Sequence, residues 1–284
     1  MKNKKFDLKV EIENVIKKYN LSSIWSKKIE LDLKKCRKIH QYSKNRKDYR
    51  GYDFVTIDGE DAKDFDDAVF CKKIKENWKL YVAIADVAHY VSKNSNIDKE
   101  AFKRGTSVYF PGFVIPMLPE VLSNDLCSLK PNEDKLVVIA EIVIDKSGSI
   151  KSYNFENALI KSSARLTYNI VEEFLKGKNI IQDPRVIKNI NNLYSLYNVL
   201  EKNRAKRNAI SFDSNEVSFF VSKSNEIESI KSSARMESQK IIEECMIAAN
   251  IASSLFIKKK IIRILFTEYM MSHQWIKLKK LQTR

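Results

Sequence analysis

The chain has 284 residues, of which 44% are hydrophobic, and it carries 51 Lys and Arg against 36 Asp and Glu. This length allows one large domain or two small ones, and the net charge of +15 favours a polyanionic partner, nucleic acid before membrane. A bias towards Lys, Ile and Asn, as found in proteins of AT-rich genomes, is the alternative explanation of the charge.

Targeting signals and cysteine motifs are lacking. The basic start has no apolar region of the kind found in secretory signals, and no run of 18 apolar residues could span a membrane. The four cysteines form no CxxC pair, their spacing fits neither a zinc site nor a disulfide framework, and the three histidines lie far apart. We therefore expect a reduced, cytoplasmic protein without a membrane partner.

The first 50 residues are strongly basic. Residues 6–19, "FDLKVEIENVIKKY", carry an imperfect helical stripe of apolar side chains. Residues 30–50, "ELDLKKCRKIHQYSKNRKDYR", are expected to form a linker or an exposed arm. Tyr42 and Tyr49 lie there among lysines and arginines, which is compatible with RNA contact, and a solvated charged face explains the same pattern.

Strand patterns dominate from residue 52 to residue 160. "YDFVTI" predicts a strand, and "DAVFCKK" and "WKLYVAIAD" predict a hairpin around a polar turn. "NIDKEAFKRG" predicts a short helix ending at Gly105. Residues 106–119, "TSVYFPGFVIPMLP", are apolar but rich in proline, so no regular element is expected. "KLVVIAEIVIDKSGSIKSYNFENALI" predicts two strands around a Ser-Gly turn.

Helical patterns follow residue 162. "TYNIVEEFLKG" predicts a helix stopped by Gly177, and residues 184–207 carry a helical apolar stripe that starts just after a proline position. "AISFD" and "EVSFFV" predict short strands, and residues 236–260 predict a strong amphipathic helix. Mixed strands followed by helices indicate an α+β fold.

The stretch "TIDGEDAKDFDDAV" places six carboxylates within ten residues, directly after a predicted strand. Carboxylates packed this closely repel one another, and burial raises their pKa values. A hard divalent cation with oxygen ligands relieves this repulsion, so Asp58, Asp64, Asp66 and Asp67 suggest Mg²⁺, or Mn²⁺ in its place, acting on phosphate.

Three other interpretations of this stretch compete. An EF-hand loop counted from Asp58 would need Gly and Glu where Lys63 and Val69 stand, so that pattern fails. Asp58-Gly-Glu60 matches the Asp-x-Glu first motif of a different exonuclease superfamily, but the match is two residues long. A solvated acidic loop without function is the third.

The same stretch resembles the signature of the ribonuclease II / ribonuclease R family of RNB-type 3′-to-5′ exoribonucleases. The likeness continues through "YVAIADVAHYV", "YFPGFVIPMLPEVLSNDLCSLKPNED", "RNAISFD" and "IIEECMIAAN" and covers about residues 50–256. It implies an RNB-type catalytic domain that hydrolyses single-stranded RNA to nucleotide monophosphates. It also assigns roles to seven residues: a magnesium site to Asp58, Asp64, Asp66 and Asp67, stacking on bases to Tyr109 and Phe212, and an RNA contact to Glu243.

The resemblance also implies a division of the chain. We expect a basic connector or arm over 1–50, part of an RNB catalytic domain over 51–265 and a divergent tail over 266–284. One codon choice for residues 267–275, read in a shifted frame, gives the family's own segment, so the tail is predicted to be frameshifted. The family's further RNA contacts, including an arginine near the scissile bond, are not found in this sequence.

Three hypotheses follow from this division. The first is a metal-dependent 3′-to-5′ exoribonuclease, or the front part of one. The second is a catalytically impaired RNA-binding fragment, the product of a decaying or split gene. The third is a chain complemented by a separately encoded C-terminal half.

Overall fold

A computed structural model describes residues 7–36, 45–207, 216–222 and 227–282. Seven helices, one π-helical turn and eleven strands are described in these ranges. In chain order they are α1 (Leu8–Lys18), α2 (Lys27–Cys36), β1 (Lys47–Asp48), β2 (Val55–Asp58), β3 (Asp67–Ile74), β4 (Asn77–Ala85), α3 (Val87–Tyr90), α4 (Asn96–Arg104), β5 (Val108–Phe110), β6 (Phe113–Ile115), η2 (Leu122–Leu126), β7 (Asp134–Ile144), β8 (Ile150–Lys161), β9 (Ala164–Thr167), α5 (Tyr168–Leu175), α6 (Pro184–Lys206), β10 (Glu216–Val221), β11 (Ile227–Ser233) and α7 (Glu237–Gln282).

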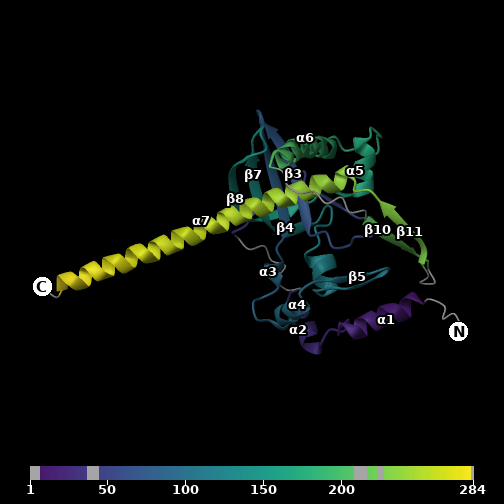
Figure 1. Ribbon diagram of the computed structural model, residues 1–284, viewed down its shortest axis with the longest axis horizontal. Helices are drawn as coiled ribbons and strands as arrows, with labels where there is room; N and C mark the ends of the chain where they lie inside the picture. The colour runs from purple at the N-terminus through teal and green to yellow at the C-terminus, as the bar shows by residue number, and fades with distance from the viewer. Residues whose placement is uncertain (1–6, 37–44, 208–215, 223–226, 283–284) are drawn as a thin grey trace.

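A seven-stranded mixed sheet in the order β1-β8-β7-β4-β3-β2-β9 forms the centre of the molecule (Figure 1). The predicted hairpins β3–β4 and β7–β8 are confirmed as antiparallel pairs. Gly148, in the predicted Ser-Gly turn, has a φ of +80°, and a Cβ there would lie 2.7 Å from the Cβ of Asn203 in α6. Glycine therefore suits this turn both by its conformation and by the close approach of the helix.

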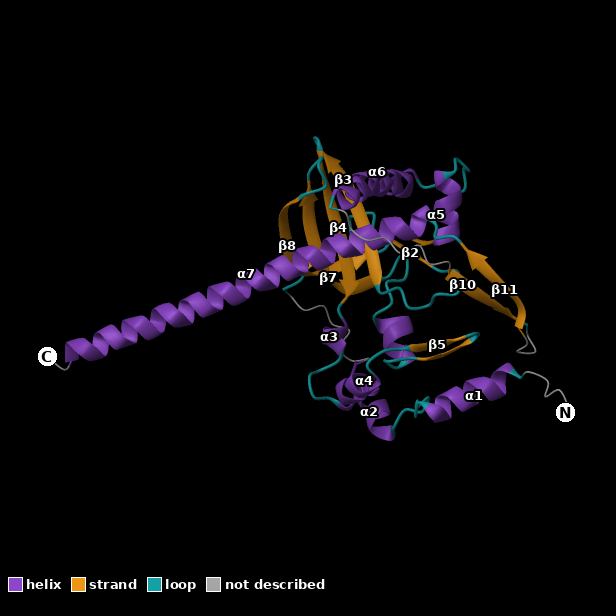
Figure 2. Ribbon diagram, viewed as in Figure 1, coloured by secondary structure: helices purple, strands orange, loops and turns teal. Residues whose placement is uncertain are grey.

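Each face of the sheet is covered by a separate apolar core. On one face, Val55, Val69 and Leu80 belong to a cluster with residues of α5, α6 and α7, among them Ile190 and Ile241. On the other face, the cluster includes residues of α2, α4 and η2. Its largest fully buried side chains include Tyr81, Phe54, Ile97, Leu122, Leu129, Ile139 and Ile160. Figure 2 shows the helices placed around the sheet. The α+β expectation, with strands before helices, is confirmed.

Local sequence signals explain the helix boundaries. The Ser95 hydroxyl accepts a hydrogen bond from the Asp98 amide at 3.1 Å, and Gly105 ends α4 with a φ of +73°. The Asp183 carboxylate caps α6, with Pro184 in its first turn. The helices predicted near residues 6–19, 96–105, 167–177, 184–207 and 236–260 are all present.

The prediction that residues 106–119 form no regular element is wrong. Strands β5 and β6 pair as an antiparallel hairpin over Val108–Phe110 and Phe113–Ile115. The prolines at 111, 116 and 119 all lie outside these strands, and Gly112 makes the turn with a φ of +72°. A proline-rich segment can form a hairpin when its prolines fall at the turn and after the last paired residue.

The prediction of a linker or exposed arm over residues 30–50 is also wrong where the structure describes it. Residues 27–36 form α2, whose Ile29 and Cys36 are buried. Strand β1 pairs in parallel with β8, and the Tyr49 ring is buried against Tyr52 and Tyr81. Tyr49 is therefore a core residue, whereas Tyr42 lies outside the described residues.

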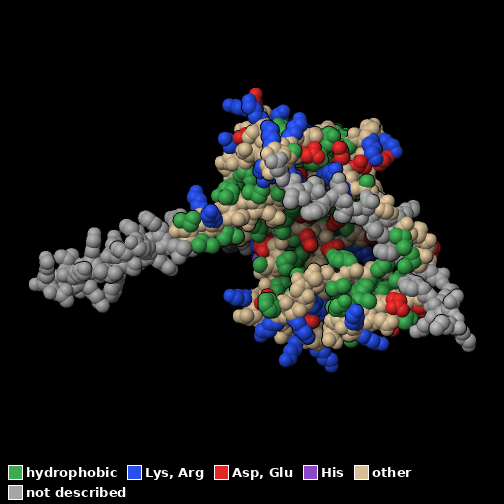
Figure 3. Space-filling model, in the orientation of Figure 1, with side chains coloured by type: hydrophobic (Ala, Val, Ile, Leu, Met, Phe, Trp, Pro, Cys, Tyr) green, Lys and Arg blue, Asp and Glu red, His purple; other side chains and the backbone are tan. Residues whose placement is uncertain are grey.

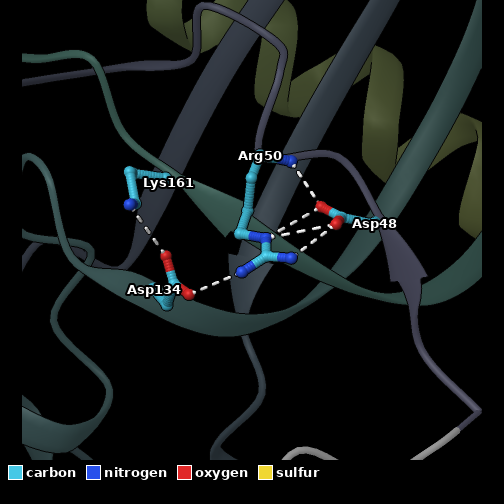
Figure 4. Close-up of polar contacts among 4 residues, drawn as sticks. All are labelled: Asp48, Arg50, Asp134 and Lys161. Atoms are coloured by element: carbon cyan, nitrogen blue, oxygen red, sulfur yellow. Dashed lines mark hydrogen bonds and ion pairs between the residues drawn. The ribbon is translucent and has the colours of Figure 1, made fainter.

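An ion-pair network fastens this segment to the sheet (Figure 4). The Arg50 guanidinium donates to both Asp48 carboxylate oxygens and, at 2.9 Å, to Asp134 at the start of β7. Lys161, at the end of β8, pairs with Asp134 at 3.3 Å. The hydrogen bonds from Arg50 lower the pKa of Asp48 to about 2. Three strands are thus linked at one end of the sheet by alternating charges.

Helix α7 crosses the sheet and then extends away from the rest of the molecule (Figure 1). Its first half is buried through Ile241, Cys245 and Ala252, whereas Ile257, Ile261 and Ile262 are about half exposed. None of the described helices is long and apolar enough to cross a membrane. The four cysteines are free and buried.

Candidate active site

The four predicted aspartates lie around one edge of the central sheet. Asp58 is the last residue of β2, Asp67 is the first residue of β3, and Asp64 and Asp66 belong to the loop between them. Because β2 and β3 are antiparallel neighbours, the end of one strand and the start of the other lie side by side. Figure 3 shows acidic side chains gathered in a hollow in the middle of the molecule's face.

Backbone contacts from other elements hold this loop. The Arg165 guanidinium, in β9, donates to the carbonyl oxygens of Gly59 and Glu60 at 2.9 and 2.6 Å. The amide of Ala85, at the end of β4, donates to the Asp66 carbonyl at 2.9 Å. Strand β9 reaches this position because it pairs in parallel with β2, with Asp58 opposite Thr167. Sequence analysis did not identify Arg165, because a strand partner more than 100 residues away leaves no local signal.

Asp58, Asp66 and Asp67 have raised pKa values. Burial, and then the charges of Asp64 and Asp58, raise the pKa of Asp66 to about 6. Burial, and then the charges of Asp58 and Asp66, raise the pKa of Asp67 to about 6. Burial also raises the pKa of Asp58, although the Gly59 amide and the Arg165 charge oppose this effect. The cluster therefore stores electrostatic repulsion that a bound cation would relieve.

Asp67→Asn is expected to raise the unfolding temperature of the metal-free protein at neutral pH. The folded-state pKa of about 6 lies above the ordinary value of 3.8. Protonation of Asp67 therefore stabilises the fold below pH 3.8, and this contribution is lost as the pH rises through 6. Asparagine is neutral at every pH, so its advantage should be present at pH 7.5 and disappear near pH 4.

Thermal unfolding in EDTA at these two pH values checks this prediction. Asp61→Asn is the matched control, because Asp61 is an exposed carboxylate of the same loop. A gain for Asp67→Asn that is equal at both pH values, or that Asp61→Asn shares, would contradict the electrostatic explanation.

The structure brings Tyr109 to the same site. Tyr109 lies in β5 and is 72% exposed. Partial burial, and then the negative charges of Asp64 and Asp66, raise the pKa of its hydroxyl. An exposed aromatic ring is thus close enough to the aspartates to feel their charge, and one of its faces is free to contact a ligand.

Of the other two residues predicted to contact RNA, the structure describes Glu243. Glu243, in α7, pairs with Arg204 of α6 at 3.4 Å and also with Arg235. Its carboxylate is therefore engaged by cations of this chain, and its contact with RNA stays a prediction. Phe212 lies outside the described residues.

The oxygen donors of the aspartate site are of the kind that bind a divalent cation, but the carboxylates are not arranged as a complete coordination shell. Among the residues that the structure describes, no group of three or more His, Cys, Asp or Glu side chains is arranged to hold a metal ion. The available donors are carboxylate oxygens with pKa values raised by burial and mutual repulsion. Such donors fit Mg²⁺ or Mn²⁺, which prefer hard oxygen ligands.

A family model described as RNB domain matches residues 46–283, so the chain belongs to the RNB domain family. Its relatives include ribonucleases R. The chain is 42% identical to that of Buchnera aphidicola over 94% of its own length and 37% of the relative's, and 49% identical to that of Vibrio parahaemolyticus over 75% and 26%. The motif-based resemblance is thereby confirmed.

A solved structure gives the same result at the level of the fold. The chain superposes on RNase R of Mycoplasma genitalium in complex with ribose-methylated single-stranded RNA with a TM-score of 0.82 and 32% identity. The alignment covers 89% of this chain and 40% of that one. This chain therefore spans well under half of each of these relatives.

Proposed function

We propose that this chain carries the carboxylate site of a 3′-to-5′ exoribonuclease that hydrolyses single-stranded RNA to nucleotide monophosphates. The observation that carries the proposal is the meeting of four aspartates at the ends of β2 and β3 beside the exposed ring of Tyr109, with the pKa values of Asp58, Asp66 and Asp67 raised by burial and by neighbouring carboxylates. Membership of the RNB domain family and the similarity to ribonucleases R support it.

Asp58, Asp64, Asp66 and Asp67 would hold Mg²⁺, or Mn²⁺ in its place. When bound, such an ion polarises a phosphoryl oxygen and lowers the pKa of an attacking water. The carboxylates set where the ion lies, since the ends of β2 and β3 fix Asp58 and Asp67. Partial burial of Asp58 and Asp67 strengthens the attraction between these carboxylates and a cation.

Tyr109 would stack on the base at the 3′ end, and Phe212 would close the other end of the stack. An aromatic face holds any base, and each stacked base contributes roughly 1–3 kcal/mol. Glu243 would contact the RNA from α7. This arrangement explains hydrolysis without sequence choice, because the contacts are made to base faces and to the phosphate.

A second candidate function is RNA binding with impaired hydrolysis, relieved by a separately encoded C-terminal half. Ile257, Ile261 and Ile262 of α7 are each about half exposed, which is unusual for three large apolar side chains on one stretch of helix. A further polypeptide segment that packed on α7 would cover them.

The protein is proposed to act in the cytoplasm, where thiols such as its four buried free cysteines stay reduced.

An RNA-trimming assay is expected to show a ladder of products shortened from the 3′ end. The purified chain is incubated with 5′-labelled single-stranded RNA and Mg²⁺, and EDTA is added to a parallel sample. Chelation should stop the reaction, because the carboxylates would lose the ion that they hold. Readdition of Mg²⁺ in excess should restore it.

The same assay separates the candidates. RNA retained in a gel-shift experiment without any shortening would support binding with impaired hydrolysis. Recovery of the ladder on addition of the C-terminal remainder of a ribonuclease R would then support a separate second half. Shortening that is insensitive to EDTA would overturn the metal-dependent proposal.

A further inference from the structure

One buried hydroxyl brackets Asp64 on both sides. The Ser128 Oγ donates to the Lys63 carbonyl oxygen at 2.9 Å and accepts from the Phe65 amide at 3.1 Å. The next residue, Leu129, donates its amide to the Phe65 carbonyl at 2.8 Å. Three hydrogen bonds from two consecutive residues therefore hold the backbone immediately before and after Asp64.

Ser128 lies where water cannot replace these bonds. It is fully buried and follows the π-helical turn η2. Its neighbours Cys127 and Leu129 are also buried, with exposed fractions of 2% and 0%. Without the hydroxyl, the Phe65 amide would lose its partner in this apolar setting, which makes the hydrogen-bonded loop conformation unfavourable.

Asp64, the residue between these hydrogen-bonded positions, is the aspartate whose charge affects most of the other groups of the site. The charge of Asp64 is the largest carboxylate contribution to the raised pKa values of Asp58, Asp66 and Tyr109. Phe65, on the other side, anchors the loop through its buried ring. With the backbone fixed at both flanks, the position of the Asp64 carboxylate depends on only two side-chain torsions.

We propose that Ser128 is a positioning residue that sets the place of the Asp64 carboxylate among the other three aspartates. It acts through the two backbone groups that flank Asp64 and touches neither RNA nor a metal ion. The inference rests on the proposed function, since it concerns the readiness of the same carboxylates to bind a divalent cation. It explains why a hydroxyl is buried between the apolar residues Cys127 and Leu129.

Ser128→Ala is expected to weaken Mn²⁺ binding by about 10-fold, which is usual when a group that orients a ligand is lost. Titration calorimetry of the whole chain with Mn²⁺ alone, without RNA, measures this effect. Ser128→Thr keeps the hydroxyl and should retain most of the affinity. The matched control is Ser162→Ala, which removes another buried hydroxyl that bonds the Phe54 and Ala164 carbonyls.

A double-mutant cycle separates positioning from general destabilisation. In the Asp64→Asn background, Ser128→Ala should change the Mn²⁺ affinity little, because the carboxylate that it positions is already gone. A full 10-fold loss in that background, or an equal loss in Ser162→Ala, would overturn the proposal.

Hydrogen exchange tests the same inference without any metal. The Phe65 amide should exchange faster in Ser128→Ala than in the wild type, while the paired amides of β3 and β4 keep their protection. Unchanged protection at Phe65 would overturn the proposal. If the wild type binds no Mn²⁺, the proposed metal-dependent function fails, whereas this experiment still decides whether Ser128 holds the loop.

Discussion

Asp66→Asn is expected to slow RNA hydrolysis by on the order of 100- to 1,000-fold, as when a group that stabilises developing charge is removed. Asparagine keeps the size of the side chain but loses the negative charge that would attract the cation. Asp66 is the informative choice because the Ala85 amide holds it through its backbone carbonyl, so a substitution of the same size should leave packing intact. Single-turnover rates on labelled RNA at saturating Mg²⁺ measure the effect.

Asp61→Asn provides the matched control for this experiment. Asp61 lies in the same loop and is exposed, but it is not among the four proposed ligands. Its rate should stay close to that of the wild type. Equal losses in both variants would mean that the overall charge of the loop, and not a specific ligand, matters. An undiminished rate for Asp66→Asn would remove Asp66 from the site.

Asn189→Ala is expected to lower the free energy of unfolding by about 3 kcal/mol, since it leaves buried backbone groups unpaired. Asn189 is 1% exposed and lies in α6. Its side chain accepts from the Cys71 amide at 2.8 Å and donates to the carbonyl oxygens of Asp53 and Val69 at 2.9 and 3.2 Å. Chemical denaturation of the two proteins measures the difference.

The reason for this large effect is that β2 is shorter than β3, so part of β3 has no neighbouring strand on that side. Strand β3 pairs with β2 at Val55 and Val69, and beyond that point α6 supplies its hydrogen bonds through Asn189 and Asn192. Asn198→Ala is the matched control, because Asn198 bonds within the same helix to the Tyr194 carbonyl. A loss for Asn189→Ala no larger than that for the control would show that the edge does not depend on this side chain.

Local patterns in the sequence predicted much of the fold. The β3–β4 and β7–β8 hairpins follow from strand-like residues around short turns, and the end of α4 and the start of α6 follow from Gly105 and Pro184. The β5–β6 hairpin and the packing of residues 45–50 were not predicted. Prolines and lysines indicate loops by composition, whereas their positions relative to paired backbone groups decide the structure.

The meeting of the four aspartates could be predicted because they are close in sequence, whereas their role stays a prediction. Burial, and then the charges of neighbouring aspartates, raise the pKa values of Asp58, Asp66 and Asp67. Tyr109 could be assigned only by resemblance, since its approach to the aspartates depends on a hairpin about 50 residues away. Ser128 and Arg165 were missed for the same reason: the side chain of each comes from a distant segment and bonds to the backbone of the loop.

The contacts that complete the aspartate loop are formed late along the chain. Asp58 and Asp67 appear early during synthesis, but Ser128 and Arg165, which hold the loop, and Asn189, which holds the adjoining strand β3, are 63 or more residues further on from their partners. Long-range contacts of this kind close large loops, which makes folding slow. A nascent chain that has not yet exposed β9 and α6 therefore has all four carboxylates but no assembled site. Any activity of this site would begin only after β9 and α6 have left the ribosome.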